Sequence, residues 1–291
     1  MERENLMNRK RQIERYRKLS IVFLIFCALA AIFAIALEKN TVLAQNPVKA
    51  LENTIDKGDF KVGFSPATLK KYPKKAMPKD VAESVLEIAQ SLNEIIALPY
   101  DVYLNFDTCG EPNAFYNPEV KEITMCYEFL ADFERVFKKV SKKQAEIDDM
   151  VEGTTVVFFF HELGHCLIDV WDLPATGREE DAVDQLALFV LLDGTPEGEN
   201  MVLSAVTFFD VVSREQGTAN LAFWGEHSLD QQRFYDMLCL TYGSNPTQNK
   251  FLLGKNGLPR ERSQGCEAEY SRVNRSWQKL LLPYLKIEAT K

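Results

Sequence analysis

The alternation of apolar and polar positions predicts two short strands followed by a series of helices. Residues 100–106 (YDVYLNF) and 121–127 (KEITMCY) alternate with the period of two that is typical of strands, and the Gly-, Pro- and Asn-rich stretch between them predicts a turn. Asp80 and Glu83 form a capping-box pattern at the start of a helix that is expected to end near Leu98. Further helices are expected at residues 128–143, 149–170, 178–192, 197–214, 228–242 and 259–282. Strands early and helices late indicate the α+β class, with a mainly helical C-terminal part.

The beginning of the chain has a different pattern, in which a basic stretch at residues 3–18 precedes an apolar run at residues 19–37. This run of 19 uncharged residues is long enough to span a bilayer, while Val42-Leu43-Ala44 has the small-residue pattern of a cleavage site. Residues 1–44 are therefore predicted to be a signal peptide or a membrane anchor. In either case the rest of the chain, the body of the protein, is expected outside the cytoplasm, in the periplasm or a similar compartment. If residues 19–37 are retained, they tether it to the inner membrane.

Residues 45–79 lie between this segment and the body, and they are predicted to be a linker or a short N-terminal extension. A pro-segment is a further interpretation of the same stretch. Within it, residues 60–65 (FKVGFS) predict a short strand, and residues 66–79 are rich in Lys and Pro, as in a connection. Residues 80–291 then form the predicted functional domain.

Composition and charge narrow the classes of function. Hydrophobic residues make up 46% of the chain, which suits a globular protein with a substantial core and excludes a disordered one. The formal net charge is −8, and the first 44 residues are net basic, so the body is still more acidic than the whole chain. Such a body lacks the basic face that nucleic acid requires, so no nucleic-acid partner is expected. Membrane contact is expected only through the N-terminal apolar segment.

The cysteines fit an exported protein. Apart from one cysteine in the apolar run, the body carries Cys109 and Cys126 around a predicted hairpin, and Cys239 and Cys266 around a C-terminal loop. Two disulfides, Cys109–Cys126 and Cys239–Cys266, are the economical pairing, although the sequence alone leaves the connectivity open. Cys166 then remains as a buried thiol in an apolar helix.

The sequence His161-Glu162-Leu163-Gly164-His165 lies in the helix predicted at residues 149–170. Histidines four residues apart share one face of a helix, so both imidazoles can reach one metal ion. Glu162 is rotated about 100° from His161, which places its carboxylate near a water bound to that metal. The run of apolar residues ahead of this motif buries the helix, and charged groups in a buried helix need a partner. A bound metal ion would be such a partner, so metal binding explains the motif better than chance occurrence does.

A catalytic zinc ion takes three protein ligands and leaves one position for water. The next helix begins with acidic residues, among which Glu180 and Asp184 are four apart and share a face. Glu180 is therefore predicted to be the third ligand, and Asp184 is predicted to orient a ligating histidine. Glu179, Asp181 and Asp184 are rival candidates for the ligand role. The simpler interpretation is that these acids only favour a helix N-terminus, as is expected for Glu179.

The third histidine of the chain, His227, precedes the helix predicted at residues 228–242. It is predicted to stabilise the oxyanion that forms when water attacks a carbonyl, with Glu226 or Arg233 in support. A fourth metal ligand or an ordinary surface histidine are the other interpretations of this residue. Tyr116 is expected to border the cleft.

These residues resemble those of a known family, the exported bacterial metallopeptidases of the zincin type. The resemblance rests on four blocks, which are CGEPNAFYNPEVKEITMCYE (109–128), FFFHELGHCLIDVWDLPATGREEDAVDQLA (158–187), EHSLDQQRFYDMLCLTYG (226–243) and LPRERSQGCEAEY (258–270). It implies a zincin-like fold, with a small mixed sheet beside the HExxH helix and an edge strand along the substrate groove, here residues 121–127. The arrangement of Glu180 and Asp184 resembles the glutamate-ligand (gluzincin) branch, in which Glu binds zinc and Asp supports a histidine. The gap between His165 and Glu180 is short for that pattern.

The expected function is hydrolysis of peptides or proteins outside the cytoplasm by one zinc ion. His161, His165 and Glu180 would hold the ion, and Glu162 would act as general base. His227 would stabilise the oxyanion. Two other functions are compatible with the sequence, namely a zinc-stabilised binding protein without turnover and a zinc amidohydrolase that acts on a non-peptide amide.

Overall fold

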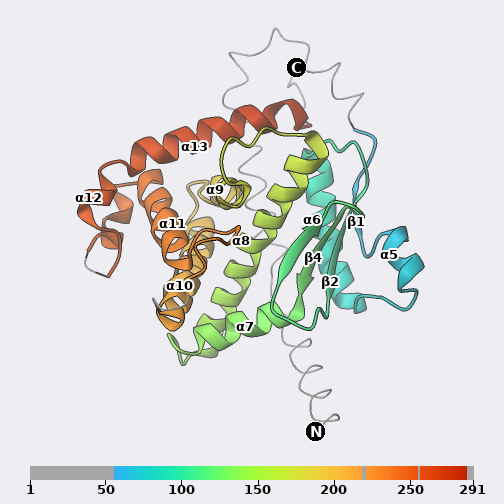
Figure 1. Cartoon of the computed structure of the whole chain (residues 1–291), viewed down its shortest axis with the longest axis horizontal. Coiled ribbons are helices and arrows are strands. Elements are labelled where there is room, and N and C mark those ends of the chain that lie inside the picture. The colour runs from blue at the N-terminus through green and yellow to red at the C-terminus, as the bar shows by residue number, and fades with distance from the viewer. Residues whose placement is uncertain (1–55, 218–220, 255, 287–291) are drawn as a thin grey trace.

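The computed structural model describes residues 56–217, 221–254 and 256–286 (Figure 1). The predicted signal or anchor segment, residues 1–44, lies outside the described residues. In chain order the elements are β1 (Phe60–Val62), α5 (Pro66–Lys71), α6 (Lys79–Ile95), β2 (Val102–Asp107), β3 (Ala114–Asn117), β4 (Glu122–Cys126), α7 (Tyr127–Phe137), α8 (Gln144–Trp171), α9 (Glu179–Leu191), α10 (Pro196–Gln216), α11 (Asp230–Ser244), η1 (Gln248–Leu252), α12 (Arg260–Ser263), α13 (Cys266–Leu281) and η2 (Leu282–Tyr284).

The strands form one small mixed sheet in the order β1-β2-β4-β3. β1, β2 and β4 are parallel, and β3 is antiparallel to β4. Leu104 and Ile123 are paired in register, and together with Met125 they line a small pocket that side chains of α6 and α8 also line. The sheet and the helices after it confirm the α+β class with a mainly helical C-terminal part. β1 and α5 lie in the segment that the sequence left open as a linker or extension.

Helix α8 is the central element of the fold. It runs through the middle of the molecule, with the sheet on one side and α9, α10 and α11 on the other (Figure 1). Val156, Val157, Phe158, Phe159 and Phe160 are all buried, as expected for a helix that is apolar on every side. The helix ends at Trp171, and its C-cap residue Asp172 adopts the left-handed conformation with φ of 51°. Polar groups on α8 are therefore held in a rigid and largely dry environment.

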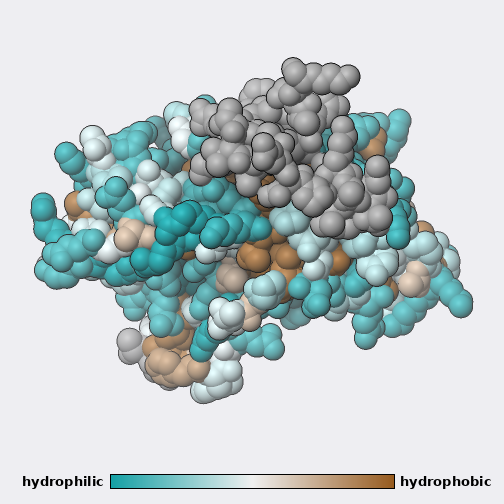
Figure 2. Space-filling view, turned by 90° about the horizontal axis from the view of Figure 1, so that it is seen from above, coloured by the Kyte–Doolittle hydropathy of each residue, from teal (hydrophilic) through white to brown (hydrophobic). Residues whose placement is uncertain are grey.

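The outer helices are amphipathic. In α13, Val273, Trp277 and Leu281 recur every four residues and are buried against the rest of the fold. Figure 2 views the molecule from the side on which α13 lies and shows hydrophilic residues over most of the described surface on that face. None of the helices in the described residues is long and apolar enough to cross a membrane.

The structure corrects two expectations about the sheet. Residues 114–117 were expected in a turn, but they form β3, and the turn is confined to Pro118–Lys121. Residues 121–127 were expected to be the edge strand, but β4 is bonded to β2 on one side and to β3 on the other. The four-residue turn brings β3 back along β4. The edge beside α8 is therefore β3.

Three helix boundaries differ from those expected from the sequence. The cap of α6 is Pro78, so the expected capping box of Asp80 and Glu83 does not form. Residues 128–143 were expected to be one helix, but α7 ends at Phe137. The helix expected at residues 259–282 is divided into α12 and α13 near Gly265.

The structure has both expected disulfides, Cys109–Cys126 and Cys239–Cys266, and Cys166 is a buried free thiol.

Candidate metal centre

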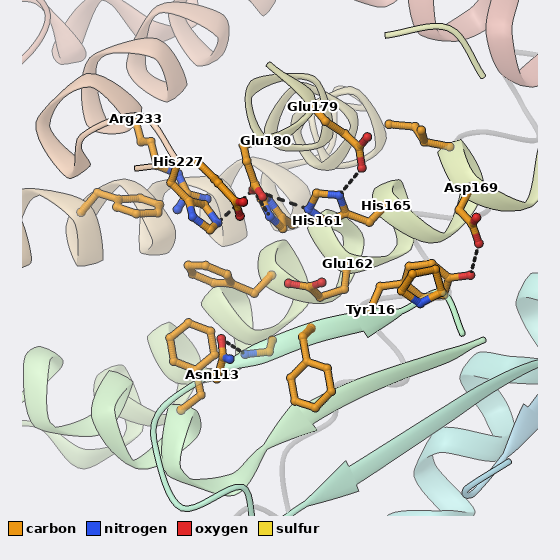
Figure 3. A pocket seen from close by; sticks show the side chains of 18 of the residues that line it. Asn113, Tyr116, His161, Glu162, His165, Asp169, Glu179, Glu180, His227 and Arg233 are labelled. Carbon is orange, nitrogen blue, oxygen red and sulfur yellow. Dashed lines mark hydrogen bonds and ion pairs between the residues drawn. The ribbon is translucent and has the colours of Figure 1, made fainter. Parts of the chain in front are cut away.

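Helices α8 and α9 form the core of the site because they pack very closely. A Cβ atom on Gly164, in the middle of the HELGH sequence, would lie 2.7 Å from Cγ1 of Val183 on α9. The absence of a side chain at this position lets the two helices approach. The acidic N-terminal turn of α9 thereby comes to lie over His161 and His165 on α8 (Figure 3).

Each histidine of α8 has its own carboxylate partner on α9. Nδ1 of His161 lies 2.8 Å from Oδ1 of Asp184, and Nδ1 of His165 lies 2.7 Å from Oε1 of Glu179. An ionised carboxylate accepts a hydrogen bond, so Nδ1 of each ring is the donor. This leaves Nε2 of each ring as the atom that can bind a metal ion.

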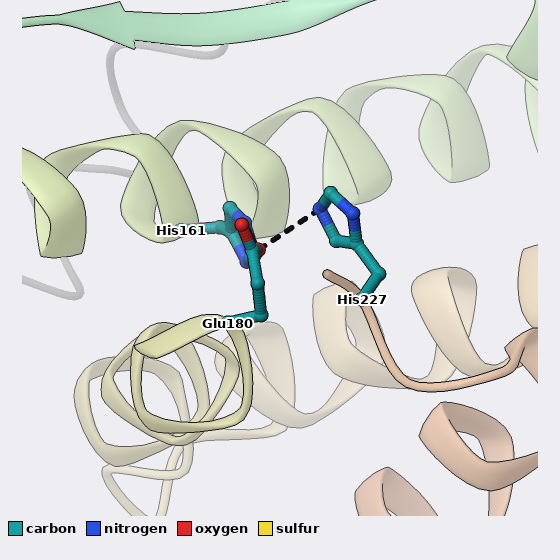
Figure 4. Close-up of side chains that lie close together, drawn as sticks. All are labelled: His161, Glu180 and His227. Carbon is teal, nitrogen blue, oxygen red and sulfur yellow. Dashed lines mark ion pairs between the residues drawn. The ribbon is translucent and has the colours of Figure 1, made fainter. Parts of the chain in front are cut away.

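The free ring nitrogens converge on one carboxylate oxygen. Oε2 of Glu180 lies 3.2 Å from Nε2 of His161, 3.5 Å from Nε2 of His165 and 2.9 Å from Nε2 of His227. This oxygen is buried and makes no hydrogen bond of regular geometry with the described residues. Figure 4 shows Glu180 between His161 and His227.

These separations fit the ligand set of a single metal ion. One ligand atom from each of His161, Glu180 and His227 lies within 4.8 Å of the other two, and the predicted ligand His165 is not part of this group. Ligands about 2.0–2.1 Å from a tetrahedral zinc ion would be separated from one another by about 3.3 Å. The three distances from Glu180 Oε2 lie on either side of that value. A bound cation would also satisfy the buried oxygen that lacks a regular hydrogen bond.

Asp184 is held in place from the opposite side by Arg233 of α11. The guanidinium makes two bonds to this carboxylate, of 2.7 Å from Nε to Oδ2 and 2.6 Å from Nη2 to Oδ1. Arg233 is buried and lies over the ring of Phe209, with 4.3 Å from Cζ to the ring centroid. Burial opposes ionisation of Asp184, but Arg233 and His161 keep the pKa of this carboxyl far below its usual range. Asp184 is therefore an ionised anchor for His161.

The other ionisable groups of the site have perturbed pKa values. Burial raises the pKa of Glu162, and the nearby His161 and His165 oppose this rise. Burial also disfavours a charged His161, but its hydrogen bond to Asp184 and its close contact with the Glu180 carboxylate raise the pKa of the imidazole to about 9. The pKa of Glu180 is shifted upward by burial and far downward by the three imidazoles, with a low net value. Without a metal ion, the imidazole of His161 is therefore protonated at neutral pH, and a bound cation would displace that proton.

The site opens into a cleft of about 900 Å³. Glu162 lies on the floor of this cleft, between the histidines and β3 (Figure 3). Near the N-terminal side of the motif the cleft is lined by aromatic residues of α7, α8 and α10, which are Phe129, Phe158, Phe208 and Phe209. Near the C-terminal end of α8 the lining is more polar and includes Asp169 and Asp172.

The structure brings most of the sequence-predicted site residues together. Glu180 points at the histidines, whereas its rival Asp181 accepts a 2.7 Å hydrogen bond from Ser228 Oγ instead. Tyr116 borders the cleft as expected, and its hydroxyl donates a 2.6 Å hydrogen bond to Asp169. Glu226 lines the cleft.

The role of Glu179 was missed. It was considered as a rival metal ligand and as an acid that favours the start of a helix, but its bond to His165 was not predicted. The one available signal was its position directly before Glu180. The sequence does not show which of two adjacent acids faces which histidine.

Convergent histidines, a shared carboxylate and a buried glutamate beside them define a metal-dependent hydrolase type of site. Residues 70–281, more than two thirds of the chain, match the family described as "Putative metallopeptidase". The chain belongs to this metallopeptidase family. Neither a curated protein nor a solved structure matches it. Family membership implies a bound metal ion and a peptide or protein substrate.

Proposed function

We propose that the protein is a zinc-dependent peptidase with a zincin-like fold that acts outside the cytoplasm. The observation that carries this proposal is the convergence of imidazole nitrogens on Glu180 Oε2, directly beside the buried Glu162. His161, His165 and Glu180 would hold the zinc ion, with Asp184 and Glu179 fixing the two rings of α8. Nitrogen and carboxylate ligands in a nearly tetrahedral arrangement suit zinc.

The chemistry that zinc would supply at this site is a lower pKa of a coordinated water, about 7, and polarisation of the substrate carbonyl. Glu162 would serve as the general base that accepts a proton from the attacking water and donates it to the leaving amine. Burial suits this role, because the raised pKa of Glu162 makes the carboxylate a stronger base than an exposed glutamate. The apolar surroundings of α8 limit the access of bulk water to this proton transfer.

His227 is proposed to stabilise the oxyanion that develops on the substrate carbonyl. It lies on the other side of the Glu180 carboxylate from His161 (Figure 4) and lines the cleft. An imidazole N–H in this position can donate a hydrogen bond to the developing charge. Arg233 contributes indirectly, because it fixes Asp184 and thereby the orientation of His161.

The substrate is proposed to lie in extended form along β3. Ala114, Phe115 and Tyr116 line the cleft, and β3 is bonded to another strand on one side only. An unpaired strand edge offers backbone donors and acceptors to a peptide, which then pairs as an added strand. A peptide bound there would pass over Glu162.

Export is supported by two features of the chain. Residues 1–44 carry a basic stretch and an apolar run, which together are typical of a signal peptide or an anchor. The two disulfides are compatible with an oxidising compartment. We therefore place the proposed activity in the periplasm or a comparable space.

The substitution Glu162→Gln tests the function. The amide keeps the size of the side chain but is not a base, so zinc content should stay near one ion per chain while turnover of a peptide library falls by at least about 10³-fold. Zinc is measured by elemental analysis and cleavage by mass spectrometry of the products. Undiminished cleavage by the variant would rule out Glu162 as the base.

The same assay separates the alternatives. A wild-type protein that binds zinc and cleaves no peptide, but hydrolyses a panel of cell-wall or amino-sugar amides, would be an amidohydrolase. A wild-type protein that binds zinc and turns over neither set would be a binding protein. Asp172→Asn serves as the matched control, because it replaces a carboxylate of the cleft lining that makes no hydrogen bond or ion pair with the proposed zinc ligands, and Asn tolerates the left-handed backbone at this position.

A further inference from the structure

His227 differs from the other two histidines in how it is held. The side chains of His161 and His165 are 3% and 17% exposed, whereas that of His227 is 55% exposed. Carboxylates on α9 fix Nδ1 of both α8 histidines, but no hydrogen bond from the described residues holds Nδ1 of His227. The segment before it lies at the surface, where the side chain of Trp224 is 86% exposed.

Despite this loose support, His227 makes the closest approach to Glu180. Its Nε2 lies 2.9 Å from Oε2, compared with 3.2 Å for His161 and 3.5 Å for His165. The rings of His161 and His227 are nearly parallel, with an interplanar angle of 15° and centroids 6.0 Å apart. Both rings therefore direct Nε2 to the same oxygen from neighbouring positions, as two ligands of one ion do (Figure 4).

We propose that His227 is a fourth, exchangeable metal ligand in the substrate-free protein. This inference rests on the proposed function, and it extends that function to the resting state of the site. Four protein ligands close the coordination of zinc, whereas catalysis requires an open position. His227 therefore has to leave the metal before a water or a substrate carbonyl takes its place.

The local structure allows this exchange without a large movement. Ser228, the next residue, is bonded to Asp181 on α9, so the backbone after His227 is fixed to the same helix that carries Glu180. Rotation about the side-chain bonds of His227 is sufficient to withdraw Nε2. For an exposed side chain such rotations are fast. A withdrawn imidazole remains at the edge of the cleft, where it can donate to the oxyanion.

Cobalt substitution of the full chain tests the inference with a readout other than turnover. Co²⁺ has visible absorption bands that depend on the number and type of its ligands. His227→Ala should change these bands, and added imidazole should restore the wild-type spectrum by occupying the vacated position. Imidazole should bind to Co²⁺ in this variant at least tenfold more tightly than in the wild type, in which His227 competes with it.

His227→Gln is the matched variant, because its amide retains a hydrogen-bond donor but is a poor metal ligand. Its cobalt spectrum should resemble that of His227→Ala. If both variants keep the wild-type spectrum and the wild-type affinity for imidazole, His227 is no ligand and the inference is overturned. If the wild type binds no Co²⁺, or if His161→Ala binds it as tightly as the wild type, the proposed metal site itself fails.

Discussion

At the scale of single residues, the two nitrogens of each α8 imidazole have different partners. Asp184 and Glu179 bind Nδ1 of His161 and His165, which leaves both Nε2 atoms for a metal ion. Asp184 is in turn fixed by a buried arginine. The orientation of His161 is therefore determined by two side chains from other helices, Asp184 of α9 and Arg233 of α11.

The pKa of His161 leads to a prediction about pH. In the metal-free protein this pKa is raised from 6.5 to about 9 by Asp184 and Glu180, against the opposing effect of burial. Below about pH 9 a metal ion must therefore displace a proton, and the apparent affinity for zinc should rise up to about tenfold per pH unit between pH 6.5 and 8.5. Competition with a chelator of known pH dependence measures this slope.

Asp184→Asn is the control for that experiment. It removes the carboxylate that raises the pKa of His161, so the variant should bind zinc more weakly and with a shallower pH slope. A wild-type affinity that is constant over this pH range would contradict the assignment of His161 as a protonated ligand.

At the scale of secondary-structure elements, the decisive feature is the packing of α9 on α8. The ligands come from both helices, so the distance between the helices sets the distance between the ligands. Gly164 is the point of closest contact, because a Cβ atom there would meet Val183 and Leu186. The glycine in HELGH is thus a packing residue that positions the metal site.

Gly164→Ala should consequently weaken both the fold and the site. The added methyl group forces α9 away from α8, at a cost of about 1–3 kcal/mol in the free energy of unfolding. Zinc affinity should fall by at least tenfold, because Glu180 moves with α9. Chemical denaturation and zinc titration measure the two effects. Gly177→Ala, in the loop that joins the same helices, has open space around its Cβ and should change neither.

At the scale of the whole molecule, two disulfides fix segments that surround the central helix. Cys109–Cys126 joins the end of β4 to the stretch before β3, and Cys239–Cys266 joins α11 to α13. The first bond supports the edge strand of the cleft. The second supports the helix that carries Arg233.

Removal of the second disulfide should destabilise the protein without altering the chemistry of the site. The double substitution of Cys239 and Cys266 by Ser should lower the free energy of unfolding by about 3 kcal/mol, because the unfolded chain regains the freedom of a closed loop. Thermal unfolding of the metal-loaded protein measures this change. Cys166→Ala is the control, because it removes a thiol and keeps both disulfides. Added reductant should lower the thermal stability of this variant as much as that of the wild type. An unchanged stability of the double variant would show that packing alone fixes α13 to α11.

The sequence determined those features that depend on neighbours along the chain. Helical periodicity placed His161 and His165 on one face, and the acids of the next helix were recognised from their spacing. The α+β class followed from the order of strand and helix patterns, and the family resemblance from residues that lie in separate blocks. Local rules suffice for these features because they depend on patterns within single helices, strands and motifs and on the order of these patterns along the chain.

The tertiary structure decided what depends on contacts between distant segments. It made β3 rather than β4 the edge of the sheet, since a strand's position depends on its partners and not on its own pattern. It assigned Glu179 to His165 and Asp184 to His161, because the rotation of α9 on α8 determines which acid faces which ring. It also brought His227, 47 residues beyond Glu180 in the chain, into contact with that carboxylate. No local pattern encodes such a contact, because packing of whole elements produces it.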